Sequence, residues 1–140
     1  MGYEITISIG GKVNKYNKEK LEELNKILTN EIEQEDSKEE KFRSKNFTGF
    51  YGGKIVIYEN GVIDFDSKNL RGHFYDTDDM AEVLSEIIED GYIKMTFLGE
   101  NGEQWGYFIK PNKVEFLEPI LVPENLKRKI KEIIDKELGS

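Results

Sequence analysis

Apolar residues recur at helical spacing in three segments of this 140-residue chain. The first segment covers residues 17–32 and begins at Asn17, whose side chain can cap a helix. The second covers residues 76–90, with Asp76 or Thr77 as its cap, and the third follows Pro123. We predict amphipathic helices whose inner faces are Leu21, Leu24, Ile27, Leu28 and Ile32 in the first, Met80, Val83, Leu84, Ile87 and Ile88 in the second, and Leu126, Ile130, Ile133, Ile134 and Leu138 in the third.

Alternating apolar and polar residues predict strands around these helices. A first strand over residues 3–9 is expected to end at Gly10-Gly11. Asn60-Gly61 predicts a type I′ hairpin turn, because both residue types tolerate a positive φ. A second Asn-Gly turn is expected at Asn101-Gly102, in a slightly longer loop over residues 99–103. The other predicted strands cover residues 54–59, 62–66, 70–75, 93–98, 104–109 and 114–119.

The predicted elements follow the order β-α-βββ-α-βββ-α within one domain, residues 1–140. Hairpins interspersed with helices predict an α+β fold, in which the helices pack on one face of an antiparallel sheet. Residues 33–46 are polar and highly charged, and this composition predicts a mobile loop.

Charge and composition exclude several classes of function. The net charge of −8 and the pI near 4.8 argue against direct binding to nucleic acid. The chain has no cysteine, which rules out disulfides and thiolate ligands and suits a reducing cytoplasm, where we expect the protein to reside. We expect no signal peptide and no membrane association, because no run approaches the roughly 20 apolar residues of a membrane helix.

Turn glycines, aromatic positions and helix-cap residues form a pattern between Arg71 and Lys113: Phe74-Tyr75-Asp76, Asp79-Met80, Leu84-Ser85, Phe97-Leu98-Gly99-Glu100, Gly102-Glu103, Trp105, Tyr107-Phe108 and Lys113. This pattern resembles one that recurs in small, largely uncharacterised proteins of bacteriophages and mobile elements. Residues 109–112 depart from it, since such proteins usually carry a glycine turn there. The resemblance implies a compact, ferredoxin-like α+β domain in a mobile-element setting, and it assigns no catalytic residue.

Few residues are candidates for catalysis or metal binding. His73 is the only histidine, and with Asp76 or Asp79 it could serve a small metal-dependent hydrolase. One histidine without cysteine is more typical of a structural role, and the segment from Asp76 lacks the glycine and glutamate of an EF-hand. The glycine cluster over residues 49–54 leads into a strand and so departs from a phosphate-binding loop. We expect no metal, no cofactor and no enzymatic activity.

Trp105 and Tyr107 share one face of a predicted strand. If that face is exposed, the two rings could anchor a protein partner. If it faces a helix, they belong to the core, which is the more common outcome for strands beside amphipathic helices. Both residues are candidates for partner binding on the first interpretation.

Seven acidic side chains and no lysine or arginine lie between Arg71 and Lys94. Four of them fall at i, i+4, i+8 and i+11, which places them in one row on the outer face of the second helix. Such a row is either a solvated face or a surface that mimics a nucleic-acid backbone and meets a basic protein. On the second interpretation the partner-binding residues are Asp76, Asp78, Asp79, Glu82, Glu86, Glu89, Trp105 and Tyr107, with Asp78, Glu82, Glu86 and Glu89 forming the row.

These observations favour a non-enzymatic, acidic protein-binding module. The most specific hypothesis is a phage- or mobile-element-encoded inhibitor of a host nucleic-acid-processing or defence enzyme, of the anti-CRISPR or anti-restriction type, steered by the acidic row. A toxin-neutralising immunity protein and the hydrolase that uses His73 are the alternatives. A basic side on the third helix also makes a homodimer conceivable, through Lys127, Arg128, Lys129, Lys131 and Lys136.

Overall fold

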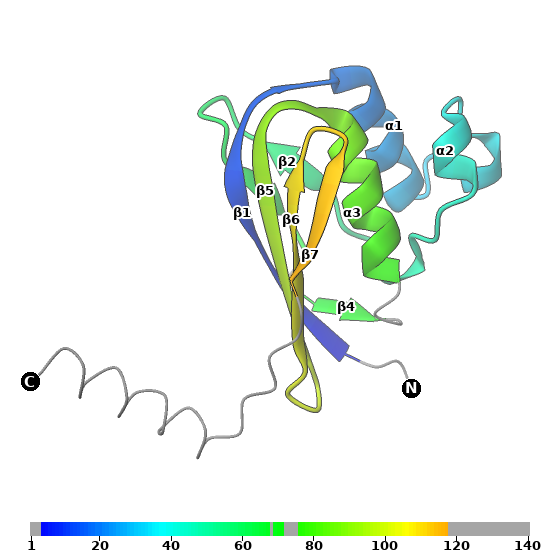
Figure 1. Cartoon of the computed structure of the whole chain (residues 1–140). Helices are drawn as coiled ribbons and strands as arrows, with labels where there is room; N and C mark the ends of the chain where they lie inside the picture. The colour runs from blue at the N-terminus through cyan, green and yellow to red at the C-terminus, as the bar shows by residue number, and fades with distance from the viewer. Residues whose placement is uncertain (1–3, 68, 72–75, 118–140) are drawn as a thin grey trace, which may run out of the picture.

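The computed structural model describes residues 4–67, 69–71 and 76–117. Two long helices and two β-sheets account for most of this part of the chain (Figure 1). The elements are β1 (Glu4–Tyr16), α1 (Lys18–Leu28), a 3-10 helix (Gln34–Asp36), α2 (Glu40–Arg43), a second 3-10 helix (Thr48–Phe50), β2 (Ile55–Ile57), β3 (Ile63–Phe65), β4 (Asn69–Arg71), α3 (Asp76–Ile87), β5 (Ile88–Gly99), β6 (Gln104–Lys110) and β7 (Lys113–Leu117).

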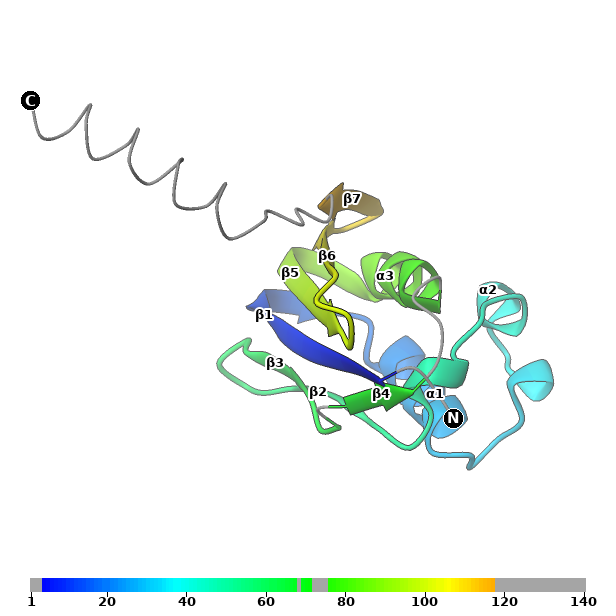
Figure 2. The same ribbon diagram turned by 90° about the horizontal axis from the view of Figure 1, so that it is seen from below.

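The larger sheet has five strands in the order β4-β1-β5-β6-β7, and every pairing in it is antiparallel. β2 and β3 form a separate two-stranded hairpin. α1 and α3 lie on the same side of the larger sheet, as the two views show (Figures 1 and 2). The α+β class and the antiparallel sheet are therefore confirmed. The ferredoxin-like arrangement stays a prediction, and the third predicted helix lies outside the described residues.

β1 does not end at Gly10-Gly11, contrary to the sequence-based expectation, and continues to Tyr16. Gly11 has a φ of 128°, and a Cβ built there would lie 2.3 Å from the carbonyl oxygen of Tyr92 on β5. The glycine therefore permits close approach of two paired strands at a conformation that other residues rarely adopt. A glycine pair that predicts a turn here serves a long central strand instead.

The first Asn-Gly turn differs from the prediction, whereas the second lies in a longer loop, as predicted. Asn60 has no positive φ, whereas Gly61 has a φ of 87°, and the Gly61 N–H donates to the carbonyl of Tyr58 at 2.9 Å. The second turn repeats this pattern, with Gly102 at a φ of 86° donating to Gly99 at 3.0 Å. Both hairpins thus use a longer loop that closes on a left-handed glycine, and at Asn60-Gly61 this loop replaces the predicted two-residue type I′ turn.

A side-chain cap sets the start of α1, and pairing with β1 sets the end of α3. Asn17 caps α1, because its side chain accepts a hydrogen bond from the N–H of Lys20 at 3.1 Å, as predicted. α1 ends at Leu28 and not at residue 32. α3 ends at Ile87 instead of residue 90, and β5 begins at once because Ile88 pairs with Tyr16. The apolar pattern runs unbroken across this boundary and so conceals it.

Residues 33–46, expected to form a mobile loop, contain α2 and a 3-10 helix. Phe42 of α2 is 1% exposed, and its ring meets the buried ring of Phe47 edge-on with centroids 6.2 Å apart. These aromatic residues join the core formed by the inner faces of α1, α3 and the sheet. The charged segment is therefore held against the domain. Within the described residues, no helix is long and apolar enough to cross a membrane.

Candidate functional site

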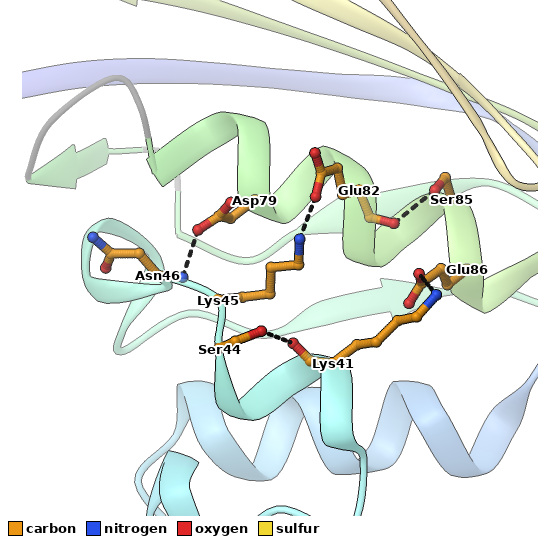
Figure 3. Close-up of polar contacts among 8 residues, drawn as sticks. All are labelled: Lys41, Ser44, Lys45, Asn46, Asp79, Glu82, Ser85 and Glu86. Carbon is orange, nitrogen blue, oxygen red and sulfur yellow. Dashed lines mark hydrogen bonds and ion pairs between the residues drawn. The ribbon is translucent and has the colours of Figure 1, made fainter.

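Two ion pairs join the outer face of α3 to the chain around α2 (Figure 3). Lys41 Nζ lies 2.6 Å from Glu86 Oε1, and Lys45 Nζ pairs with Glu82 Oε2. The hydrogen bond from Lys45 to Glu82 raises the pKa of the Lys45 ammonium above its usual value. The two lysines have the same spacing in the sequence as the two glutamates, so they match the carboxylates one to one.

Two other residues of the predicted acidic set also have partners within the chain, and one of them, Glu89, lies on β5 and not on the predicted helix. Asp79 Oδ2 accepts the backbone N–H of Asn46 at 2.7 Å (Figure 3). Glu89, at the start of β5, lies 3.4 Å from Lys15 Nζ. Asp76 is the first residue of α3, and its side chain lies outside the part of the structure that is described.

The predicted acidic row is therefore not a free anionic surface. Exposed ion pairs of this kind contribute only about 0–1 kcal/mol each to stability. Their larger effect here is on the electrostatic field, because each lysine offsets the charge of one carboxylate in the row. The lysines come from the segment that was expected to be a mobile loop, so the sequence pattern of α3 alone could not reveal them.

Trp105 and Tyr107 lie in the core, with 8% and 2% of their surfaces exposed. Trp105 Nε1 donates to Thr77 Oγ1 at 3.1 Å, Thr77 Oγ1 lies 2.7 Å from the Tyr107 hydroxyl, and that hydroxyl donates to Asp78 Oδ1. Burial, reinforced by the bond to Asp78, raises the pKa of Tyr107 well above its usual range. This network satisfies the polar ends of buried aromatic residues. It supports the core interpretation, and neither ring is presented to a partner.

His73 lies outside the described residues. Among the residues that are described, no group of three or more histidine, cysteine, aspartate or glutamate side chains is placed to hold a metal ion.

The side of the larger sheet opposite α1 and α3 carries no helix within the described residues (Figure 2). We call this side the open face. Side chains alternate along β1 and β5, so that Ile5 and Ile7 are buried while Thr6 and Ser8 are exposed. The same alternation exposes Lys94 and Leu98 on β5, with Leu98 43% exposed. An open face of this kind is available to a partner without disturbing the core.

One half of the open face carries two stacked aromatic rings. Tyr92 on β5 is 42% exposed, and its ring lies parallel to that of Phe108 on β6, with centroids 5.4 Å apart. The Lys110 ammonium sits 5.5 Å above the Phe108 ring, and Lys94 pairs with Phe108 across the strands. We call Tyr92, Lys94, Phe108 and Lys110 the aromatic–lysine cluster.

The other half of the open face is hollowed. The hollow has a volume of about 480 Å³, and among the residues that line it are Thr6, Ser8, Thr96, Leu98, Gly106 and Leu117. Cross-strand pairing brings Ser8, Thr96, Gly106 and Leu117 into one row across four strands. Because Gly106 has no side chain, the row dips at its centre.

The alternation of Lys94, Thr96 and Leu98 along the strand predicted over residues 93–98 is a sequence signal for the open face. The signal is incomplete, because this predicted strand begins after Tyr92. Which side of the sheet the helices cover is a tertiary property that alternation does not reveal.

Comparison with protein-family models, with curated proteins and with solved structures found no match for this chain. The resemblance to phage and mobile-element proteins therefore stays a prediction.

Proposed function

We propose that the chain is a non-catalytic protein-binding module whose contact surface is the aromatic–lysine cluster of the open face. The observation that carries this proposal is the stacking of exposed Tyr92 on half-buried Phe108, framed by lysines on a sheet face that no described helix covers. Exposed aromatic rings at the centre of a surface are the groups that most often dominate protein–protein affinity. The partner surface that fits is an apolar patch bordered by carboxylates.

Single-stranded nucleic acid fits this cluster less well. Base stacking on a sheet needs aromatic rings with free faces. Here one face of Phe108 is covered by Tyr92 and Lys110 also sits over the ring. The net charge of −8 would in addition repel a phosphate backbone.

The specific form that we propose is an inhibitor of a host nucleic-acid-processing or defence enzyme, encoded by a phage or mobile element and acting in the cytoplasm. The overall negative charge favours approach to such a basic enzyme, and the cysteine-free composition suits the cytoplasm. Because the cluster carries lysines and the α3 carboxylates are paired, contact would occur outside the phosphate-binding cleft. Inhibition should then persist at saturating nucleic acid. If nucleic acid competed with the inhibitor, the result would instead support mimicry of the nucleic-acid backbone by the acidic row.

Affinity capture with matched variants tests the binding surface. The tagged chain, its Tyr92→Ser/Phe108→Ser variant and a Tyr58→Ser control are each exposed to nuclease-treated lysate of a low-GC bacterium, and captured proteins are quantified by mass spectrometry. Tyr58 is 52% exposed on the β2–β3 hairpin and so controls for loss of a surface tyrosine. We expect a stoichiometric partner that is retained by the control and lost by the double variant. Equal retention by both variants would rule out the cluster as the contact.

A further inference from the structure

The hollow on the open face is an apolar surface with nothing over it among the described residues. Leu98 is a large apolar side chain that is 43% exposed, and it lines the hollow together with Leu117 and with the longer polar side chains of Lys94 and Gln104. Contiguous exposed apolar surface usually marks a place that another segment or molecule covers. Leu117, the last described residue of β7, borders this hollow.

The chain continues from Leu117 for 23 residues, 118–140, which lie outside the described part. Their sequence has an apolar stripe at helical spacing that begins at Leu126 and ends at Leu138. Arg128 and Glu132 fall on the side of the helical wheel opposite this stripe. An amphipathic segment of this kind has an apolar face to bury, and it leaves the domain at the rim of an uncovered apolar hollow.

We propose that residues 124–138 dock in cis on the hollow, with the apolar stripe of the segment facing Leu98 and Leu117. The length of the apolar stripe is comparable with the extent of the hollow. The stripe from Leu126 to Leu138 would be roughly 18 Å long as a helix. The hollow extends over residues 94–98 of β5, roughly 13 Å along the strand, and across four strands about 4.8 Å apart.

The short tether favours docking within the same chain over docking on a second copy. Residues 118–123 can span at most roughly 20 Å, and they start at the hollow itself. A short tether keeps the effective local concentration of the segment near the millimolar range. A second copy of the chain would have to reach a comparable concentration to compete.

Docking at the hollow would leave Tyr92, Phe108 and Lys110 of the aromatic–lysine cluster uncovered, because only Lys94 of the cluster lines the hollow. The inference therefore goes beyond the proposed function and does not depend on it. With the segment in place, the sheet would have helices on both sides at one end and an open contact surface at the other.

Engineered cysteines test the docking, and the chain has no cysteine of its own to interfere. A disulfide requires two Cα atoms within about 7 Å. Under mild oxidation, we expect Leu98→Cys/Ile130→Cys to form an intramolecular disulfide, seen as a monomer with altered mobility on a non-reducing gel. The matched control Leu98→Cys/Glu132→Cys should form at most a tenth as much, because position 132 faces away. Equal crosslinking of the two variants, no crosslinking of either, or a covalent dimer in place of the monomer would each overturn the proposal.

A second measurement does not require substitution of the hollow. A spin label on Glu132→Cys in the full chain should broaden the amide resonances of Ser8 and Thr96 at least several-fold more than those of Asp64 on the distant hairpin. As a control, a spin-labelled chain without isotope enrichment is mixed with an isotope-enriched chain that carries no spin label. Docking in cis predicts no broadening in this mixture, because the observed chain has no spin label of its own. Uniform broadening, no broadening, or broadening in the mixed sample would contradict docking in cis.

Discussion

Asn25 of α1 and Ile55 of β2 exchange two hydrogen bonds in the core. The Asn25 Nδ2 donates to the carbonyl of Ile55 at 2.9 Å, and the Ile55 N–H donates to Asn25 Oδ1 at 2.8 Å. The side-chain amide thus pairs with β2 as a neighbouring strand would, and it holds the hairpin to the helix that lies on the covered side of the sheet.

Removing this amide should destabilise the whole domain. In Asn25→Leu, the buried N–H and C=O of Ile55 lose their partners, and each unsatisfied group costs about 1–3 kcal/mol. We expect the free energy of unfolding in urea to fall by roughly 2–5 kcal/mol. The exposed neighbour Lys26→Ala is the control and should change it by less than about 0.5 kcal/mol. Similar small changes in both variants would show that the pairing is not important for stability.

Phe42 distinguishes an ordered segment from a mobile loop. Because its ring is 1% exposed, Phe42→Ala should lower the free energy of unfolding by about 3–5 kcal/mol. Lys38→Ala, at an exposed position of the same segment, should have little effect. If Phe42→Ala were as mild as Lys38→Ala, residues 33–46 would behave as the mobile loop that their composition predicts.

The pairing of the α3 carboxylates with lysines can be measured by a charge-swap cycle. Lys41→Glu and Glu86→Lys each place like charges together, whereas the double variant restores an opposite pair. We expect a coupling energy of about 0.2–1 kcal/mol from urea unfolding, falling at 1 M salt. If the two single substitutions changed the free energy of unfolding additively and without salt dependence, the ion pair would contribute nothing to stability.

The unfolding free energy should fall at alkaline pH. Lys45 and Tyr107 both have a raised pKa in the folded protein, so the folded state holds their protons more tightly than the unfolded state does. Their contribution is complete below the unfolded pKa values near 10 and is lost as the pH rises through the folded values. Urea unfolding between pH 8 and about pH 11 should show a decline that is shallower in Tyr107→Phe. A flat or rising profile in the wild type would contradict this assignment.

The sequence predicted the fold class and the order of the strands, α1 and α3, because these depend on local periodicity, but it did not predict α2 within the charged segment. It did not predict the end of α3, because Ile87 and Ile88 satisfy both the helical pattern and the strand that pairs with Tyr16. It also did not predict the partners of Glu82 and Glu86, because those lysines come from a segment whose burial depends on Phe42. The packing of α1 and α3 on one face of the sheet was predicted, but the periodicity did not show which side chains of β5 and β6 lie on the open face.

The central claim is that the aromatic–lysine cluster, and not the acidic face of α3, contacts a partner. Site-specific photo-crosslinking tests it most directly: a photoreactive phenylalanine analogue is placed at Tyr92, at Glu82 or at Tyr58, and each protein is irradiated in host lysate. We predict a discrete crosslinked protein from position 92 and none from positions 82 and 58. A product from position 82 with none from position 92 would contradict the account and restore the acidic row as the contact surface.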